Sequence, residues 1–373
     1  MNTRRQFITD TATGLIAVGA AGQLASAQDE KKEGKKEEKK VGFAFVGIGS
    51  LTKNQLLPAV VKCKKARLAA LVTGDPEGKG KQMAEKFAPG ANIKVYNYEN
   101  YDTIKDNADV DVIYVVLPNS MHAEYTIRGF KAGKHVLCEK PMANSVKECE
   151  EMIAVGKAAK KKLMIAYRLR YETHNPKAIE IARSGVLGTN KAITAEAGFP
   201  IGDPTQWRLK KDLAGGGSLM DIGIYALNAT RYLSGEEPTE VTAVMYSTPG
   251  DPRFKEVEET ILFDMKFPSG LVATCASSYG YGCNRYRVTG TKGYVEAEPF
   301  LSYSGLALFQ NLGKGREKVD LPQVDHFAAE MDHMAECVLA GKEPVTPGEE
   351  GLKDLKVIAA IYEAAKAGKT VKV

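Results

Sequence analysis

Short apolar runs alternate with helix-like stretches through the first half of the chain. The runs predict strands over residues 41–46, 67–72, 112–117, 135–138 and 162–166. The stretches between them predict helices over residues 55–63, 80–87 and 122–132. Because strands and helices at this spacing form right-handed βαβ units, we expect a doubly wound parallel sheet.

From about residue 190 the pattern changes to long runs in which apolar and polar residues alternate. These runs cover residues 191–198, 240–247, 259–267, 271–279 and 286–289. Such alternation is typical of an open, mostly antiparallel sheet that packs one face on a core. The other face is then exposed and offers a surface for another subunit. Residues 298–319 contain no long periodic element.

The change of pattern divides the chain into two domains. A length of 373 residues is consistent with this division, since domains commonly contain ~100–200 residues. We expect an α/β domain over residues 41–163 and an α+β domain over residues 164–373.

The first 40 residues have the features of an export signal and a linker. The pair Arg4-Arg5 precedes a mildly apolar run over residues 12–21, and Ala25-Ser26-Ala27 is an A-x-A cleavage site. We therefore predict a twin-arginine signal peptide over residues 1–27, a charged tether over residues 28–40, and a periplasmic location for the folded protein. A frayed amphipathic terminus is the alternative.

Charge and cysteine content exclude several classes of partner. The net charge is +5, of which residues 1–27 and 29–40 carry +1 each, so the remaining body carries only +3. This small surplus, with no basic stripe, argues against nucleic acid. The six cysteines match neither a disulfide framework nor a metal pair, so we predict free thiols and no metal site. Residues 12–21 are too few to span ~30 Å of hydrocarbon, so no membrane partner is expected.

Glycines at the end of the first predicted strand point to a dinucleotide. Gly47-Ile48-Gly49-Ser50-Leu51-Thr52 lies where a Rossmann fold turns tightly and lets a pyrophosphate approach the N-terminus of a helix. Thr52 replaces the third glycine, and a purely structural glycine turn is the alternative. The second strand ends in Thr73-Gly74, with Lys79 nearby, instead of an acid that would bind a ribose 2′-hydroxyl. This pattern favours NADP over NAD, unless Lys79 only solvates a helix face.

Three long segments carry a resemblance to a known family. Together with Gly47 and Gly49, the stretches Leu117–Ala143, Gln206–Pro238 and Pro347–Lys369 resemble the glucose–fructose oxidoreductase and inositol dehydrogenase family. The resemblance implies an enzyme with tightly bound NADP(H) that oxidises an aldose, glucose to its lactone, and then reduces a ketose, fructose to sorbitol, by ping-pong hydride transfer. Alternatives are an ordinary NAD(P)-dependent sugar dehydrogenase, an aldose–aldose oxidoreductase, or a non-catalytic dinucleotide sensor.

The resemblance also implies which residues act in catalysis. Lys140, in the stretch Glu139-Lys140-Pro141, matches the catalytic lysine of the family, where the Lys–Pro bond is often cis. Asp221 and Tyr225 are four residues apart, so a helix would direct both side chains to one face. Tyr225 matches the sugar-oxidising subgroup, whereas most relatives have histidine there. A phenol titrates near ~10, so we expect Lys140 to assist Tyr225 in relaying the proton while Asp221 orients the sugar. A packing role for Tyr225 is the alternative.

The remaining expectations concern cofactor, sugar and subunit contacts. The expected cofactor-binding residues are Gly47, Gly49, Ser50, Leu51, Thr73, Gly74, Lys79, Leu117, Pro118, Asn119, His122, Glu139, Lys140, Tyr167, Arg168, Trp207 and Arg208. His174 and Tyr279 either border the sugar pocket or are a surface histidine with satisfied hydrogen bonds and a core tyrosine, respectively. The resemblance implies that the open sheet face packs against another subunit, in a homodimer or homotetramer.

Overall fold

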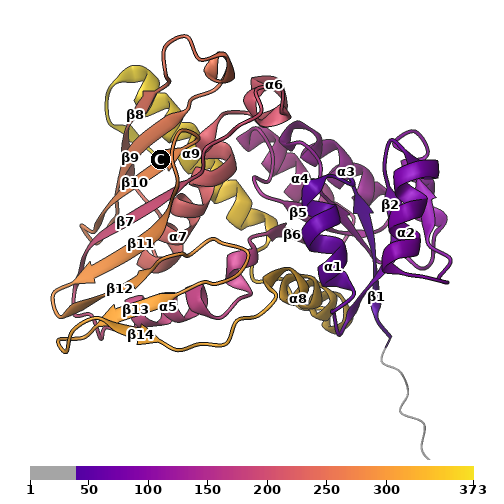
Figure 1. The fold of residues 1–373 in the computed structure, drawn as a ribbon, viewed down its shortest axis with the longest axis horizontal. Coiled ribbons are helices and arrows are strands. Elements are labelled where there is room, and N and C mark those ends of the chain that lie inside the picture. Colours follow the sequence, from indigo (N-terminus) through magenta and orange to yellow (C-terminus); the bar gives the residue numbers. More distant parts are fainter. Residues whose placement is uncertain (1–38) are drawn as a thin grey trace, which may run out of the picture. The chain divides into compact units, whose positions relative to one another are not determined.

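The computed structural model describes residues 39–373, which contain two β-sheets with helices packed against them (Figure 1). The predicted signal peptide and residues 28–38 of the predicted tether lie outside the described residues. Within the described part, none of the helices has the length and apolarity needed to cross a membrane.

The first sheet has six parallel strands in the order β3-β2-β1-β4-β5-β6. This is the strand order of a Rossmann fold, so the doubly wound sheet is confirmed. All six residues of β1 and all four of β4 are buried, which explains why these strands appear in the sequence as continuous apolar runs. The strands are β1 (Val41–Val46), β2 (Ala66–Val72), β3 (Lys94–Tyr96), β4 (Val112–Val115), β5 (His135–Glu139) and β6 (Leu163–Ala166). The helices between them are α1 (Leu57–Val60), α2 (Lys81–Phe87), α3 (His122–Lys131) and α4 (Val146–Ala158).

The second sheet has nine strands in the order β14-β13-β12-β11-β7-β10-β9-β8-β15. Only β7 and β10 pair in parallel, so the mostly antiparallel sheet is confirmed. Its strands are β7 (Asn190–Gly198), β8 (Glu240–Tyr246), β9 (Thr260–Lys266), β10 (Val272–Ser278), β11 (Cys283–Gly290), β12 (Gly293–Ala297), β13 (Leu308–Asn311), β14 (Glu317–Val319) and β15 (Val371–Lys372). The accompanying helices are α5 (His174–Arg183), α6 (Lys211–Ala214), α7 (Ile224–Ser234), α8 (His326–Ala340) and α9 (Gly348–Ala367).

One face of the second sheet is open. Along β9, Ile261, Phe263 and Met265 are buried, while Leu262 and the other residues of the opposite face are exposed. Leu262 pairs with Val244 of β8, which is 63% exposed. Together with Tyr246, these side chains form an exposed apolar patch at β8 and β9.

The two sheets do not divide the chain at a single point. β6 extends the first sheet to residue 166, past the expected boundary at residue 163. Helix α8, more than 150 residues later, packs against α1, β1 and β2 (Figure 1). Its residues Phe327, Met331 and Met334 join the core beneath β1. The pattern of the sequence did not predict β3, β12 to β15, or helices α4, α5, α8 and α9. These strands are short, and α5, α8 and α9 bury polar residues among their apolar ones.

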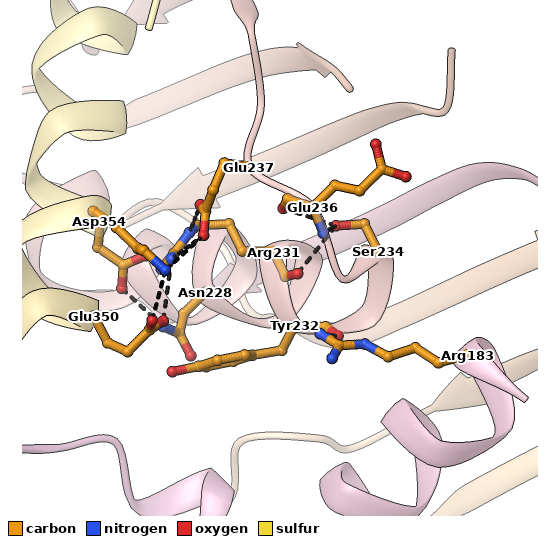
Figure 2. A network of polar contacts seen from close by, with 10 residues as sticks. Arg183, Asn228, Arg231, Tyr232, Ser234, Glu236, Glu237, Glu350 and Asp354 are labelled. Carbon is orange, nitrogen blue, oxygen red and sulfur yellow. Dashed lines mark hydrogen bonds and ion pairs between the residues drawn. The ribbon is translucent and has the colours of Figure 1, made fainter. Parts of the chain in front are cut away.

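A buried polar network joins helices α7 and α9 (Figure 2). Arg231 of α7 donates to Asp354 of α9 over 2.5 Å and to Glu350 over 3.1 Å. Asn228 also donates to Asp354 over 2.8 Å, and Glu237 accepts two further hydrogen bonds from Arg231. The side chain of Arg231 is only 2% exposed, and that of Asp354 is fully buried.

All six cysteines are free thiols. Five are buried and Cys283 is half-buried. Burial raises the pKa of Cys138, which lies near Lys140 in the sequence, so its thiol stays protonated. Among residues 39–373, no three histidine, cysteine or acidic side chains are grouped as metal ligands.

Candidate active site

The glycine turn after β1 combines a close approach with an open surface. Gly47 has φ +98°, and a Cβ there would lie 2.3 Å from the carbonyl oxygen of Val116. Thr52 donates its hydroxyl to the Gly47 carbonyl over 2.7 Å and holds the turn. At Gly49 a Cβ would meet no atom within 4 Å. The turn is therefore tightly packed on its inner side and open on the side where a ligand approaches.

The helical segment that follows begins without a side-chain cap. Leu51 occupies the N-cap position and makes no side-chain hydrogen bond to the first turn. Gly49 and Ser50 are exposed beside it. Uncapped amides at a helix N-terminus bind phosphate, so the residues present fit the pyrophosphate of a dinucleotide.

The turn after β2 has no carboxylate available for a ribose hydroxyl. Asp75, the acid in this turn, accepts hydrogen bonds from the amides of Gly78 (3.0 Å) and Lys79 (2.9 Å). These backbone hydrogen bonds lower the pKa of Asp75 and turn its carboxylate towards the following helix. Thr73 is 1% exposed and accepts from the Asp75 amide, whereas Gly74 is exposed. Thr73 thus stabilises the turn, and direct contact of Thr73, Gly74 and Lys79 with a cofactor stays a prediction.

Lys140 lies directly after β5, at the carboxyl edge of the first sheet, and its peptide bond to Pro141 is cis. Its ammonium group donates to the backbone carbonyl of Asp221 over 2.6 Å and lies 3.5 Å from Oδ1 of the same residue. The ammonium group is also 4.9 Å from the ring centre of Tyr225. The structure therefore brings together the three residues predicted to be catalytic.

Asp221 is held by donors from three separate parts of the chain. Besides Lys140, Arg208 donates to its Oδ2 over 2.9 Å and the Tyr279 hydroxyl over 3.0 Å. Burial opposes ionisation of Asp221, but Arg208 and Lys140 outweigh it and lower the pKa of the carboxyl. Trp207, half-buried, contacts the Arg208 guanidinium, 4.6 Å from the ring centre. Tyr279 is buried and also contacts Asp221, so it is both a core residue and a residue of the site.

Arg168 contacts the hydroxyl of Tyr225. Its Nε donates to that oxygen over 3.2 Å, and the guanidinium also lies over the Tyr225 ring. Nη1 donates to His326 over 3.2 Å, and Nη2 to the Leu301 carbonyl over 2.5 Å. The ring of Tyr303 stacks 4.8 Å from the guanidinium. Arg168 was expected to bind the cofactor, but this buried side chain is directed to Tyr225, which therefore has two positive charges close to it.

The segment that carries Asp221 is fixed by a buried acid. Glu258 accepts from the amides of Gly217 and Leu219, each over 2.9 Å, and from the Tyr362 hydroxyl over 3.0 Å. A Cβ at Gly217 would lie 2.1 Å from the Glu258 carbonyl oxygen, so only glycine permits this approach. The chain then forms a wide π-helical turn, Leu219–Gly223, before α7. The expectation of one regular helix is therefore corrected, although both side chains still reach Lys140.

Two predicted cofactor residues make hydrogen bonds within the protein. The ring nitrogens of His122 lie 2.8 Å from the Pro141 carbonyl and 2.9 Å from that of Leu117, and the residue is 1% exposed. His122 thus joins the loops after β4 and β5. Asn119 donates to the Ala214 carbonyl over 2.9 Å and is 4% exposed. Backbone carbonyls thus contact both side chains, and binding of the cofactor by His122 and Asn119 stays a prediction. Pro118, between them, is half-buried.

Tyr167 and His174 are directed into the core. Tyr167, 3% exposed, borders a cavity of about 20 Å³ behind Tyr225, together with Tyr232 and Tyr286. That volume holds roughly one water molecule, so neither a sugar nor a nicotinamide binds there. His174 is 2% exposed and pairs with Glu172 over 3.0 Å. His174 is therefore a buried histidine with a satisfied hydrogen bond, and the alternative of a surface histidine is corrected.

Several residues near the site were not predicted. Glu139 was expected to contact the cofactor, but its carboxyl accepts from the buried Tyr114 hydroxyl over 2.9 Å. Glu330 of α8 lies on the other side of that hydroxyl. Glu330 shares a helical face with apolar residues such as Phe327 and Met331, so a carboxylate in an apolar helical phase was the available signal. Tyr303, in an irregular stretch, left no signal of this kind.

Comparisons with known proteins agree with this geometry. Residues 41–167 match the description "Oxidoreductase family, NAD-binding Rossmann fold". Residues 176–296 match "GFO/IDH/MocA C-terminal domain". The chain belongs to the GFO/IDH/MocA family of oxidoreductases.

Relatives in this family act on sugars. The NADP(+)-dependent D-xylose 1-dehydrogenase of Haloarcula marismortui is 32% identical over 340 residues, covering 89% of this chain and 93% of the relative. The 1,5-anhydro-D-fructose reductase of Ensifer adhaerens is 25% identical, covering 89% and 98%. The crystal structure of an aldose–aldose oxidoreductase from Caulobacter crescentus, complexed with glycerol, is 51% identical with a TM-score of 0.87, covering 90% of this chain and all of that one.

Proposed function

We propose that this protein is an NADP-dependent sugar oxidoreductase that oxidises one aldose to its lactone and reduces a second aldose with the same bound cofactor. The observation that carries the proposal is that Lys140, at the carboxyl edge of the first sheet, contacts both Asp221 and Tyr225, whose hydroxyl also accepts from Arg168. The choice of two aldoses is supported by the 51% identity to an aldose–aldose oxidoreductase.

The cofactor is NADP(H), which supplies hydride transfer at its nicotinamide ring when bound. The open surface at Gly49 and the uncapped helix start at Leu51 would hold its pyrophosphate. The carboxylate of Asp75 accepts hydrogen bonds from the amides of Gly78 and Lys79, so it is not directed at a ribose 2′-hydroxyl as the acid of an NAD site is. Lys79, half-buried in the same turn, supplies a positive charge.

The side chains of the site would move the hydroxyl proton of the sugar. Tyr225 accepts that proton as a general base in its phenolate form and returns it as a general acid in the reductive step. Lys140 and Arg168 both place a positive charge close to this phenol, and Arg168 donates to its oxygen. Asp221, fixed by Arg208 and Tyr279, would position the sugar as an ionised carboxylate and would not take part in the proton transfer.

The decisive experiment uses the protein purified with its cofactor and no added NADP. With glucose alone, we expect gluconolactone and sorbitol in equal amounts, because each hydride taken from one glucose is given to another. In a parallel assay NADP is added. The proposal is overturned if product forms only in this assay and in proportion to the NADP added, since the protein is then an ordinary dehydrogenase. Binding of NADP without turnover of any sugar would instead identify a sensor.

A ketose as the acceptor is the second candidate. It is favoured by the resemblance of Gln206–Pro238 and the other segments to the glucose–fructose enzymes. An arm with glucose and isotopically labelled fructose separates the two candidates. Labelled sorbitol in excess of unlabelled sorbitol would favour fructose, and the reverse ratio would favour a second aldose.

A single methyl group at Gly49 tests the cofactor site. In Gly49→Ala, the new Cβ lies in open space, so the thermal stability of the protein without NADP should not change. The methyl group should obstruct the pyrophosphate and weaken NADP binding by about tenfold or more, which is ~1.4 kcal/mol. Titration calorimetry measures the affinity. The matched control is Gly282→Ala, whose Cβ also meets no atom and whose backbone, like that of Gly49, is not left-handed, but which lies outside the glycine turn. Unchanged affinity in Gly49→Ala would contradict the assignment.

We also propose that the protein is exported folded to the periplasm with its cofactor in place, as the pair Arg4-Arg5 suggests. Replacing both arginines with lysine should retain it in the cytoplasm on cell fractionation.

The exposed patch of Val244, Tyr246 and Leu262 supports a further proposal, association into a homodimer or homotetramer. Light scattering of Leu262→Asp should then show a smaller species than the wild-type protein.

A further inference from the structure

One phenol hydroxyl lies between two buried carboxyl groups. The Tyr114 oxygen is 2.9 Å from Oε1 of Glu139 and 3.3 Å from Oε2 of Glu330. Tyr114 and Glu330 are both completely buried. A phenol has one proton and can donate it to only one acceptor. The second contact is therefore a hydrogen bond only if one carboxyl group is protonated and donates to the phenol oxygen.

The contacts of the two carboxyl groups assign that proton to Glu330. Its other oxygen, Oε1, is buried without a partner, and no basic side chain of the described residues forms an ion pair with Glu330. Burial raises the pKa of Glu139 as well, but Lys140, which follows it in the chain, the Tyr114 hydroxyl and Arg168 all favour its ionised form. An unpaired buried carboxylate is far more costly than a neutral acid.

The charged groups around Glu330 support the same assignment. Burial, and then the charge of Glu139 on β5, raise the pKa of Glu330 well above its usual value, and Arg168 opposes this only in part. Tyr114 of β4 and Tyr171 also face it, and burial raises the pKa of both phenols. His326 on the same helix is neutral, because burial lowers its pKa to about 4.

We propose that Glu330 is a positioning residue for the reaction: as a neutral acid it donates to Tyr114, which donates to Glu139 and holds that carboxylate beside Lys140. This inference rests on the proposed function, because it assigns Glu330 an effect on the site of that reaction. Two hydrogen bonds thereby link helix α8 to Glu139, the residue that precedes the catalytic lysine. Ionisation of Glu330 would remove its donor and place a second negative charge next to Glu139.

The first test measures folding and needs no turnover. Above pH ~4.3 the unfolded chain releases the Glu330 proton, whereas the folded protein keeps it. The folded state then binds one more proton than the unfolded state, so stability falls as pH rises, by up to about tenfold in the folding equilibrium constant per pH unit. Glu330→Gln keeps a neutral donor and lacks this titration. From pH 5 to pH 8, its stability relative to wild type in equilibrium urea unfolding should rise by about tenfold or more.

The control for this test is Glu336→Gln on the same helix. Its side chain is 50% exposed and pairs with Lys65 at the surface, where an ion pair contributes little to stability. The stability of this variant relative to wild type should stay constant between pH 5 and pH 8. A constant ratio for Glu330→Gln as well would overturn the proposal, because Glu330 would then ionise as an ordinary surface acid does.

The second test separates positioning from mere packing. Infrared difference spectra of the protein with its cofactor should show a protonated carboxylic acid at pH 7 that is absent in Glu330→Gln. This variant should retain kcat within about threefold of wild type at pH 7. Where ionisation of Glu330 lowers the kcat of wild type at high pH, the kcat of Glu330→Gln should not fall. Glu330→Leu, which lacks a donor, should lower kcat by about tenfold or more, with urea unfolding confirming that it folds. Absence of the infrared band, or equal kcat in the Gln and Leu variants, would overturn the proposal. Failure of the sugar assay with the band present would instead contradict only the proposed function.

Discussion

Tyr225→Phe is expected to lower kcat for sugar oxidation by a factor of about 10²–10⁴, the usual contribution of a general acid–base group. The variant loses only the hydroxyl oxygen that accepts from Arg168, while the ring that Lys140 and Arg168 contact remains. Binding of NADP should therefore persist, and thermal stability should change little. Single-turnover kinetics with glucose, following the absorbance of the reduced nicotinamide, measure the loss in the oxidative step alone.

A matched control shows whether the loss is specific to this hydroxyl. Tyr281→Phe removes the same group from a residue that is 43% exposed and makes no contact with Lys140 or Asp221. It should react at the wild-type rate. Wild-type turnover in Tyr225→Phe would contradict its role as the proton relay and leave it as a packing residue.

Asp354→Ala is expected to lower the free energy of unfolding by about 3–5 kcal/mol, the range for breaking a buried ion pair by removing one partner. The change removes the acceptor of Arg231 and Asn228 and leaves the 2%-exposed guanidinium with Glu350 and Glu237 (Figure 2). Because this network joins α7 to α9, its loss should also loosen α7, the helix that carries Tyr225. Equilibrium urea unfolding at pH 7 measures the effect.

Two further variants give that measurement its meaning. Glu237→Gln removes an acceptor that is 46% exposed, and its cost should stay below about 1 kcal/mol. The double variant Arg231→Met with Asp354→Leu should recover much of the stability lost in Asp354→Ala, since apolar replacements of similar volume often match a buried pair. A loss below about 1 kcal/mol in Asp354→Ala would show that the network contributes little.

Local patterns in the sequence predicted the first sheet and the glycine turn well. β1 and β4 are buried on both faces, so each appears as an unbroken apolar run. The close approach at Gly47 is likewise a backbone property that the adjacent strand imposes. Lys140, Asp221 and Tyr225 were found through a family resemblance, because their contact joins positions about 80 residues apart.

Hydrogen-bonding partners, in contrast, are not visible in a local pattern. His122 and Asn119 occupy loops where ligands bind in this fold, yet each is occupied by a backbone carbonyl. Arg168 was assigned to the cofactor, but its guanidinium contacts the Leu301 carbonyl and the His326 ring, and its Nε donates to Tyr225. Histidine, asparagine and arginine are all residue types that bind ligands. The role of each of these side chains is decided by its neighbours in the folded protein.

The sequence by itself determined the doubly wound parallel sheet, the mostly antiparallel sheet and, through the family resemblance, the residues of the catalytic group. The two sheets follow from periodicity within short stretches of chain. The tertiary structure alone decided that Arg168 contacts Tyr225 and that α8 lies near the site. Helix α8 reaches β1 and Tyr114 from more than 200 residues away because its apolar face completes the core beneath the first sheet. Burial in that core is also what makes Glu330 a neutral acid, since no pattern of neighbours along the chain sets the solvation of a carboxyl group.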